Sequence, residues 1–337
     1  MTETARIAHD DDGIRVDRWF KRHYPALTHG RLEKLLRTGQ VRLNGKRVKA
    51  ADRVLSGQTV RLPPQVVHGN LQEKPRAAAK PAVRGSLEDR ILYMDKSVIV
   101  LDKPSGLATQ GGSGLTEHVD AMLDSLAFEK NTRPKLVHRL DRDTSGVLVV
   151  ARTSSAAAEL SRSLAERTAQ KIYWALTKGV PKVRRGTIKA ALAKEGGFGA
   201  HGRDERMTTV DKIDIDAKDA KDAVTDYVVL DTAGAEFAWI AVRPRTGRTH
   251  QIRVHLAALG TPIVGDFKYG GTEVRGKGAI ENRLHLHARS IDIARPDGGR
   301  LAVAAPLPPH MLKTWNLLGF DADMAANPFD RSPRRKS

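Results

Sequence analysis

Cysteine is absent from the 337-residue chain. Disulfide bonds and thiolate metal sites are therefore excluded. No apolar run approaches the roughly 20 residues that a membrane-spanning helix requires. The N-terminal sequence MTETARIAHDDDG has neither the basic nor the apolar segment of a secretory signal peptide. These absences predict a soluble, cytoplasmic protein with no membrane partner.

Acidic residues are outnumbered by basic ones. The chain has 57 Lys and Arg against 39 Asp and Glu, which gives a formal net charge of +18. Such an excess attracts polyanions, which as a class include nucleic acid and anionic membrane surfaces, and of these we expect nucleic acid. The alternative at this level is a protein that is basic for solubility alone.

The length of the chain predicts two domains, and the excess charge is concentrated near the N-terminus. Residues 13–70 contain thirteen Lys or Arg and three Asp or Glu, a net charge of +10. The stretch that follows has two prolines, an alanine triplet and no strong periodicity, which is typical of a linker. We predict a small basic domain over residues 13–65, a linker over 66–88, a larger domain over 89–316 and a disordered tail over 317–337.

Local patterns predict two helices and a hairpin in the small domain. The stretch VDRWF has apolar residues at i, i+3 and i+4, which is the spacing of a short amphipathic helix. In the second helix the leucines of RLEKLL form an apolar stripe, and Arg31 and Lys34 share a different face. VRLNGKRV alternates around an Asn-Gly pair, a strong hairpin signal, and places Lys46 and Arg47 beside the turn.

These elements together form a compact basic surface suited to phosphate. The stretch VDRWF…LTHGRLEKLLRTGQVRLNGKRV…GQTVRL resembles the small RNA-binding domain shared with ribosomal protein S-four of the small subunit. The resemblance implies that Arg31, Lys34, Lys46 and Arg47 bind RNA. A basic surface with no partner is the alternative.

In the larger domain, apolar runs such as VLVVAR, KIYWALTKG and FAWIAVRP predict strands, and residues 154–170 predict a helix capped by Ser154 or Ser155. The run HRLDRDTSG at residues 138–146 places five charged or titratable residues directly before the first of these strands. Charge packed against a buried strand favours a functional site. Residues 181–225 are irregular, and we expect them to influence target choice.

HRLDRDTSGVLVVAR closely resembles the signature of the pseudouridine synthases, in the branch that modifies large-subunit ribosomal RNA (the RluA/RluC/RluD type). VLDKPSGLATQ, QKIYWALTKG and RPRTGRTHQIRVHLAALGTPIVGDFKYG agree with the same family in order and content. The resemblance implies an α+β fold, in which the small α/β RNA-binding domain precedes a catalytic domain with a mixed, mainly antiparallel central sheet flanked by helices. It also implies a monomeric RNA isomerase that acts on large-subunit ribosomal RNA.

The reaction moves the ribose bond of uracil from N1 to C5. It includes no redox step and no phosphate cleavage, so we expect neither a cofactor nor a metal. One carboxylate can serve as nucleophile or general base. The resemblance assigns that role to Asp141, and Asp143, its nearer rival, is read as local structure or a cap.

The resemblance assigns further roles around Asp141. Arg139 inserts into the RNA and supports the flipped-out base, with a simple ion pair to Asp141 as the alternative. Arg253 pairs with the catalytic carboxylate, with a phosphate contact as the alternative. Tyr173 packs on the uracil, and a part in removing the C5 proton is left open.

Arg248 and His250 are candidates for RNA phosphate contacts, as is Lys171. His285 and His287 point to one face of a predicted strand, but without cysteine or a clear carboxylate partner they fit the core or an RNA contact better than zinc. Three alternatives remain for the whole chain: a catalytically silent ribosome assembly factor on the same scaffold, a synthase that acts on transfer RNA, and a DNA glycosylase. No duplex-reading element supports the last.

Overall fold

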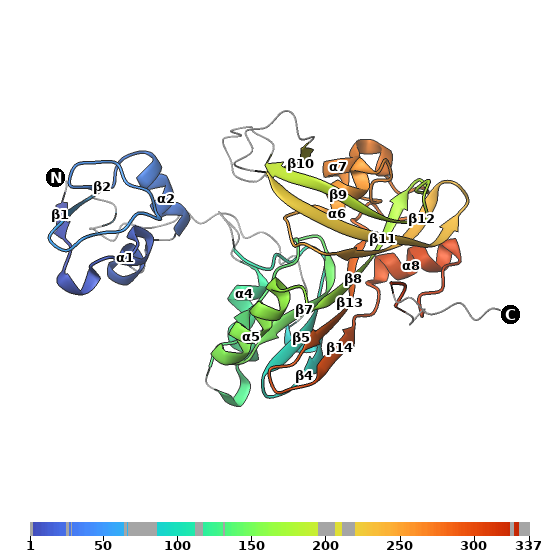
Figure 1. Cartoon of the computed structure of the whole chain (residues 1–337), viewed down its shortest axis with the longest axis horizontal. Coiled ribbons are helices and arrows are strands. Elements are labelled where there is room, and N and C mark those ends of the chain that lie inside the picture. The colour runs from blue at the N-terminus through green and yellow to red at the C-terminus, as the bar shows by residue number, and fades with distance from the viewer. Residues whose placement is uncertain are drawn as a thin grey trace. The chain divides into compact units, whose positions relative to one another are not determined.

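The chain divides into two compact units, Met1–Lys80 and Pro81–Ser337, in the computed structural model (Figure 1). The structure describes residues 3–24, 27, 29–63, 66, 86–111, 117–130, 132–194, 206–210, 220–323 and 327–329. Within these residues, no helix has both the length and the hydropathy to cross a membrane. Each unit is described by itself below.

The small unit packs two helices against a three-stranded sheet. Its elements are β1 (Glu3–Arg6), a 3₁₀ turn (His9–Asp11), α1 (Val16–His23), α2 (His29–Arg37), β2 (Arg42–Leu43) and β3 (Thr59–Leu62), and the sheet order is β1-β3-β2. The predicted apolar stripe of α2 lies in the core with Trp19 and Phe20 of α1. β1 precedes residue 13, where the sequence placed the start of this domain, because its four residues pair along β3.

The Asn-Gly hairpin forms a two-residue turn. Asn44 and Gly45 have φ values of 48° and 78°, the left-handed pair that a type I′ turn requires. Leu43 and Lys46 exchange backbone hydrogen bonds of 3.0 Å in both directions across it. The turn thus carries Lys46 and Arg47 on an exposed loop, as predicted from the sequence.

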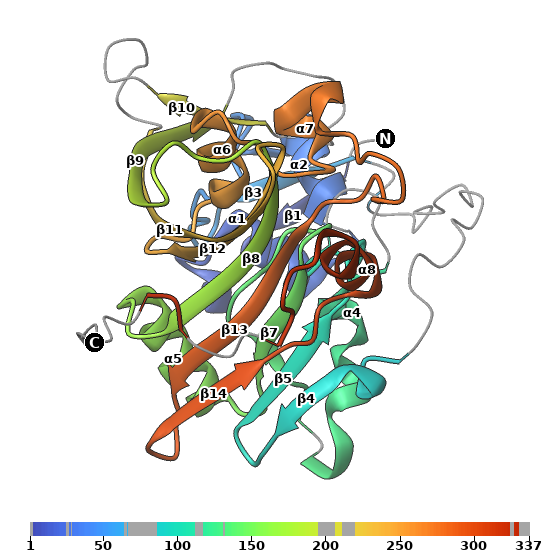
Figure 2. The same ribbon diagram turned by 90° about the vertical axis from the view of Figure 1, so that its right-hand side faces the viewer.

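An eleven-stranded mixed sheet forms the larger unit. Its main path is β10-β9-β11-β12-β8-β13-β7-β5-β4, with β14 on β13 and β6 on β7. The strands are β4 (Ile91–Met94), β5 (Val98–Lys103), β6 (Lys135–Leu136), β7 (Ser145–Ala151), β8 (Gln170–Lys178), β9 (Arg185–Lys194), β10 (Met207–Val210), β11 (Lys221–Ala233), β12 (Phe237–Pro244), β13 (Leu286–Ala294) and β14 (Arg300–Ala304). Figure 2 shows β8, β13, β7, β5 and β4 side by side.

Within the described strands, β7 and β13 form a parallel pair and every other pair is antiparallel. The predicted α+β class with a mixed, mainly antiparallel sheet is therefore confirmed. The apolar runs VLVVAR and FAWIAVRP, predicted as strands, are β7 and β12.

Helices cover both faces of this sheet. α5 (Ser154–Ala165) and α8 (Pro309–Leu318) pack on one face, and α4 (Val119–Met122) and α6 (Gln251–Ala258) pack on the other. Alternation along β7 shows the division: Val147 and Val149 join the α5 side, while Leu148 and Val150 join the α4 side. The remaining helices are α7 (Phe267–Gly270) and the 3₁₀ turns Glu88–Arg90, Leu123–Leu126, Phe128–Lys130 and Gly271–Val274.

The helix predicted over residues 154–170 is shorter and capped differently. Thr153, in extended backbone, is the N-cap, and its hydroxyl accepts the Ala156 N–H at 3.1 Å. Ser154 and Ser155 therefore lie inside the first turn rather than at the cap. The helix ends at Ala165 because β8 begins at Gln170.

The tail predicted to be disordered contains ordered aromatic residues. Phe320 and Phe329 are 5% and 8% exposed and lie in one apolar cluster with Trp239 and Trp315. The guanidinium of Arg243 lies 4.6 Å from the centre of the Phe329 ring. The prediction was wrong at these positions, because aromatic burial outweighs the polar composition around them.

Much of the predicted linker lies outside the described residues. Of residues 66–88, the structure describes 66 and 86–88, where Val66 is buried in the small unit and Leu87 in the larger one. In the irregular region 181–225, residues 195–205 and 211–219 also lie outside the described residues.

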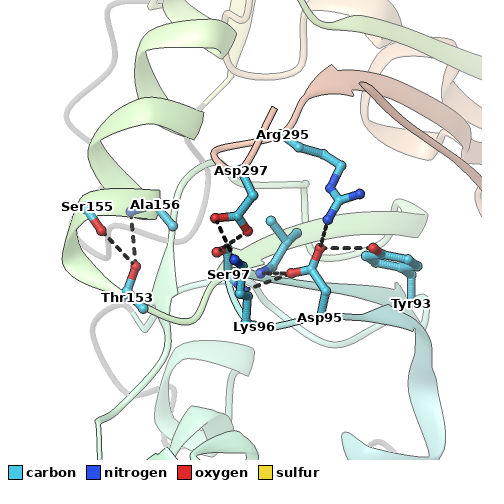
Figure 3. A network of polar contacts seen from close by, with 10 residues as sticks. Tyr93, Asp95, Lys96, Ser97, Thr153, Ser155, Ala156, Arg295 and Asp297 are labelled. Atoms are coloured by element: carbon cyan, nitrogen blue, oxygen red, sulfur yellow. Dashed lines mark hydrogen bonds and ion pairs between the residues drawn. The ribbon is translucent and has the colours of Figure 1, made fainter. Parts of the chain in front are cut away.

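A polar cluster at one end of the sheet joins two turns that are far apart in the sequence (Figure 3). Asp95, between β4 and β5, accepts backbone hydrogen bonds from Ser97 at 2.7 Å and Val98 at 2.8 Å through Oδ1. Its Oδ2 accepts from the Tyr93 hydroxyl at 2.9 Å and the Arg295 guanidinium at 3.1 Å. Burial alone would raise the pKa of Asp95, but these donors hold it below its ordinary value.

Asp95→Asn should destabilise the larger unit by about 1.5–3 kcal/mol at pH 7, because it removes hydrogen bonds to a charged acceptor. The folded-state pKa of Asp95 is lowered. Its contribution is therefore complete above the unfolded pKa near 4 and declines as the pH falls through the folded value. Urea unfolding should show the gap between wild type and variant narrowing below about pH 4. Glu159→Gln on the exposed side of α5 is the control, and an equal effect there would contradict this role.

Candidate active site

A cleft of about 280 Å³ opens on the sheet face that carries α4 and α6. This volume is near the lower end of the range for small-molecule sites, roughly 300–1,000 Å³. Tyr173 of β8 contacts the apolar clusters on both sides, so the cleft lies where the two halves of the core meet. The predicted residues that line it are Arg139, Asp141, Tyr173, Arg248, His250 and Arg253, together with Lys171.

The loop that carries Asp141 ends in a turn that leads directly into β7. The Thr144 N–H bonds the Asp141 carbonyl at 3.2 Å. At Gly146, φ is +105°, and an added Cβ would lie 2.2 Å from the carbonyl oxygen of Ala288. Only glycine allows the close parallel approach of β7 and β13 at this point.

The segment after β5 holds the Asp141 loop by side-chain hydrogen bonds to its backbone. The Thr109 hydroxyl donates to the Leu140 carbonyl at 2.7 Å and accepts the Leu140 N–H at 3.1 Å. Ser105 donates to the Asp143 carbonyl at 2.9 Å. The residues on both sides of Asp141 are thereby fixed.

Lys103 strengthens this connection from within the core. The residue is 1% exposed, and its ammonium group donates to the carbonyls of Pro104 at 2.9 Å, Leu107 at 2.7 Å and Arg142 at 3.0 Å. Burial lowers the pKa of Lys103 to about 7, although the charges of Asp143 and Asp141 favour the ammonium form. The sequence stretch VLDKPSGLATQ contains this lysine, but nothing in its pattern marked it as a support of the loop.

The Asp141 carboxylate is available to a ligand. It is partly buried at the cleft, and it makes no hydrogen bond or ion pair with any side chain of the described ranges. Its charge acts on Tyr173, His250 and Arg253. Asp143 is exposed and does not line the cleft, so Asp141 is the carboxylate of this loop that faces it.

Tyr173 contributes a ring to an otherwise charged site. It shares the cleft with the apolar side chains of Ile252 and Leu286. Burial, with the Asp141 charge, raises the pKa of the Tyr173 hydroxyl above its ordinary value. The hydroxyl therefore stays protonated at neutral pH, which favours packing on a flat ligand over action as a base.

The sequence predicted that Arg253 pairs with Asp141, but the two side chains form no direct pair. Nε and Nη2 of Arg253 donate to the two oxygens of Asp266 at 2.8 and 2.6 Å. The two side chains are 9% and 1% exposed, so this is a buried bidentate pair. The pKa of Arg253 is raised, because Asp266 and the more distant Asp141 outweigh the burial that opposes its charge. Asp266 was missed because a sequence motif does not show which of two carboxylates a guanidinium reaches.

The remaining cations of the cleft differ in their partners. Arg139 is exposed, and neither it nor Lys171 makes a hydrogen bond or ion pair within the described part of the chain. Burial lowers the pKa of Lys171. Arg248 donates to the Asp222 carbonyl at 3.3 Å, and His250 bonds the Tyr269 hydroxyl at 2.7 Å.

The buried histidines are bound by protein groups. His287 Nδ1 lies 2.9 Å from the Ser145 hydroxyl, and His285 Nε2 lies 3.0 Å from the Thr314 hydroxyl. Both rings are fully buried. A search of the described residues finds no cluster of three or more His, Cys, Asp or Glu side chains that could hold a metal ion.

The other predicted RNA contacts lie in the small unit. Lys34, Lys46 and Arg47 are exposed and Arg31 is partly exposed. A Cβ at Gly39 would meet Nε of Arg47 at 3.0 Å, so this guanidinium lies beside the end of α2. The hairpin and α2 therefore present neighbouring positive charge.

Comparison with known proteins connects this cleft to a family. Residues 97–258 match the RNA pseudouridylate synthase family model. RNA pseudouridine synthase 4, mitochondrial, of Arabidopsis thaliana is 34% identical over 94% of this chain and 82% of its own. Ribosomal large subunit pseudouridine synthase C of Vibrio cholerae is 35% identical over 92% of this chain and 95% of its own.

Solved structures agree with these sequence relatives. Human RNA Pseudouridylate Synthase Domain Containing 4 has a TM-score of 0.55 and 28% identity, covering 69% of this chain and 94% of that one. Human RNA Pseudouridylate Synthase Domain Containing 1 has a TM-score of 0.52 and 31% identity, covering 67% and 86%.

Asp266→Asn should lower the free energy of unfolding by about 3–5 kcal/mol, because it leaves the buried Arg253 charge without its counter-ion. Glu236→Gln is the matched control: its carboxylate pairs with Lys178 and Lys277 near the surface, where ion pairs contribute little to stability, so its removal should have a much smaller effect. Denaturant unfolding of both variants tests the contrast. Equal effects would show that the Arg253–Asp266 pair does not stabilise the core.

Proposed function

The chain belongs to the RNA pseudouridylate synthase family, and from this premise we propose that it converts specific uridines of large-subunit ribosomal RNA to pseudouridine through Asp141. The observation that carries the proposal is the Asp141 carboxylate, which faces the cleft beside Tyr173 and has no hydrogen-bond or ion-pair partner among the residues that the structure describes. The names of relatives such as ribosomal large subunit pseudouridine synthase C support the RNA target.

The reaction needs few chemical groups. The bond from ribose C1′ to N1 of uracil breaks, a bond from C1′ to C5 forms, C5 loses its proton and N1 gains one. A carboxylate with no protein partner can act as nucleophile at the ribose or accept a proton there. Asp141 meets that requirement wherever the chain is described, and its fixed loop supplies the orientation that such a step depends on.

Access to the ribose requires the uridine to leave its stack. Extruding a nucleotide costs a few kcal/mol, and a side chain that occupies the gap offsets part of this. Arg139 suits the role, because it is exposed at the cleft and has no partner within the described residues. Tyr173, Ile252 and Leu286 offer the apolar surface on which the extruded base can pack.

Arg253 has a different part in this proposal from the one its motif suggested. Its Nε and Nη2 donate hydrogen bonds to both oxygens of Asp266, so these nitrogens are not available to form a bidentate pair with Asp141. The charge of Asp141 still acts on Arg253 at longer range and helps to raise the pKa of its guanidinium. We propose further that the active unit is a monomer and that it works in the cytoplasm.

Asp141→Asn should reduce isomerisation by on the order of 10³-fold or more, because an amide has no charge and is a very poor nucleophile. RNA affinity should stay close to wild type, since the side chain keeps its shape. Tritium release from C5-labelled uridine in a ribosomal RNA transcript measures the first effect, and filter binding the second. Asp143→Asn is the control and should be much milder; the opposite ranking would mean that Asp143 is the working carboxylate.

The small unit should supply affinity rather than chemistry. Replacing Arg31, Lys34, Lys46 and Arg47 together by alanine should weaken RNA binding and flatten its salt dependence. The slope should change by about 0.7 for each phosphate of single-stranded RNA that these side chains no longer neutralise. Turnover at saturating RNA should be retained, with Lys313→Ala on the exposed side of α8 as the control. A folded variant that is inactive at saturating RNA would refute this division of labour.

A further inference from the structure

Tyr269, which lies behind the cleft in α7, connects two residues that line it. Its hydroxyl lies 2.7 Å from Nδ1 of His250. Its ring lies 5.0 Å from the guanidinium carbon of Arg253. Tyr269 itself is not among the residues that line the cleft, so any effect it has on a bound nucleotide must pass through these two neighbours.

His250 has an unusual backbone at this position. It is the N-cap of α6, with φ 53° and ψ 17° in the left-handed region, and its side chain makes no capping hydrogen bond. Left-handed backbone at a residue other than glycine costs free energy and recurs at functional sites. Here it leaves the imidazole free to reach Tyr269 on one side and the cleft on the other.

The hydrogen bonds of the Tyr269 hydroxyl determine where its proton goes. The backbone N–H of Met207 can only donate, and it donates to this hydroxyl at 3.1 Å. The phenolic hydrogen is then available to Nδ1 of His250, which accepts it as an unprotonated nitrogen. The opposite arrangement would leave the phenolic hydrogen without an acceptor in the described residues.

The neutral imidazole that this requires is favoured by its surroundings. Burial, with the cations Arg253 and Lys268, lowers the pKa of His250, although Asp141 and Asp266 act in the opposite direction. A neutral ring with Nδ1 accepting carries its proton on Nε2. Nε2 makes no hydrogen bond within the described chain, so it is free to serve a ligand.

We propose that Tyr269 is a positioning residue that fixes the tautomer of His250, so that Nε2–H donates a hydrogen bond to an oxygen of the nucleotide held in the cleft. The acceptor is a uracil carbonyl or a phosphate oxygen of that nucleotide. The contact with the nucleotide rests on the proposed function, whereas the tautomer is a property of the protein without RNA.

The tautomer is measured first, on the full-length chain without RNA. Nitrogen-15 NMR of histidine side chains separates the two neutral forms, and the signal missing in His250→Asn assigns His250. Wild type should show His250 as the Nε2–H form, and Tyr269→Phe should show a mixture. An Nδ1–H form in wild type would overturn the proposal, whatever the enzyme does with RNA.

The kinetic test uses a double-mutant cycle. Tyr269→Phe keeps the ring on Arg253 and removes one hydroxyl, so kcat should fall about five- to tenfold, the equivalent of one hydrogen bond. His250→Asn suits left-handed backbone but has no donor at the Nε2 position, and its kcat should fall at least as much. In the His250→Asn background, Tyr269→Phe should have no further effect. Additive effects would mean that Tyr269 does not act through His250.

Controls separate this proposal from the proposed function. Tyr227→Phe removes a hydroxyl that donates to the Val183 carbonyl away from the cleft, and kcat should not change. Because the proposed imidazole is neutral, His250→Asn should lower kcat without changing the salt slope of RNA binding; a drop of about 0.7 in that slope would mean that His250 binds phosphate as a cation and would overturn the neutral tautomer. Wild-type protein with no isomerase activity would refute the proposed function and the contact with the nucleotide, while the tautomer result would stand.

Discussion

The buried amino group of Lys103, whose pKa burial lowers to about 7, constrains where the loop that carries Asp141 can lie. A polar group removed from water is strongly unfavourable, in its ammonium form above all, unless hydrogen bonds replace those to solvent. Lys103 finds three carbonyl oxygens: two in the segment that follows it and a third at Arg142. Because the third belongs to the Asp141 loop, burying this cation requires the loop to stay against the end of β5.

The topology of the sheet holds the same loop from its other end. β7 and β13 run parallel over a short stretch at Ser145 and Gly146, inside a sheet that is otherwise antiparallel wherever it is described. A side chain at Gly146 would collide with the backbone of β13. The loop therefore enters β7 where the two halves of the core meet, and Asp141 arrives at the cleft beside Tyr173.

Features that depend on neighbouring residues could be predicted from the sequence, and those that depend on distant ones could not. A strand buried on both faces is an apolar run, so VLVVAR indicated β7. An Asn-Gly pair likewise indicated the hairpin turn of the small unit. The Asp141 loop and the residues around the cleft were identified by motif. Tertiary packing alone decides that Arg253 reaches Asp266, that β1 pairs with β3, and that Phe329 is buried in a polar tail.

The cleft contains two kinds of polar group: those with a protein partner and those without one. The first kind supports the geometry of the site, and the second kind is available to a substrate. Arg253 is paired with Asp266, and His250 with Tyr269, so the geometry of each is set before a nucleotide arrives. Asp141, Arg139 and Lys171 have no hydrogen-bond or ion-pair partner within the described chain. In the proposed function the RNA offers a partner to each: phosphate for Lys171, the gap left by the extruded base for Arg139, and a reacting ribose for Asp141. The side chains that have no partner in the described chain are thus the ones that we expect to contact the RNA.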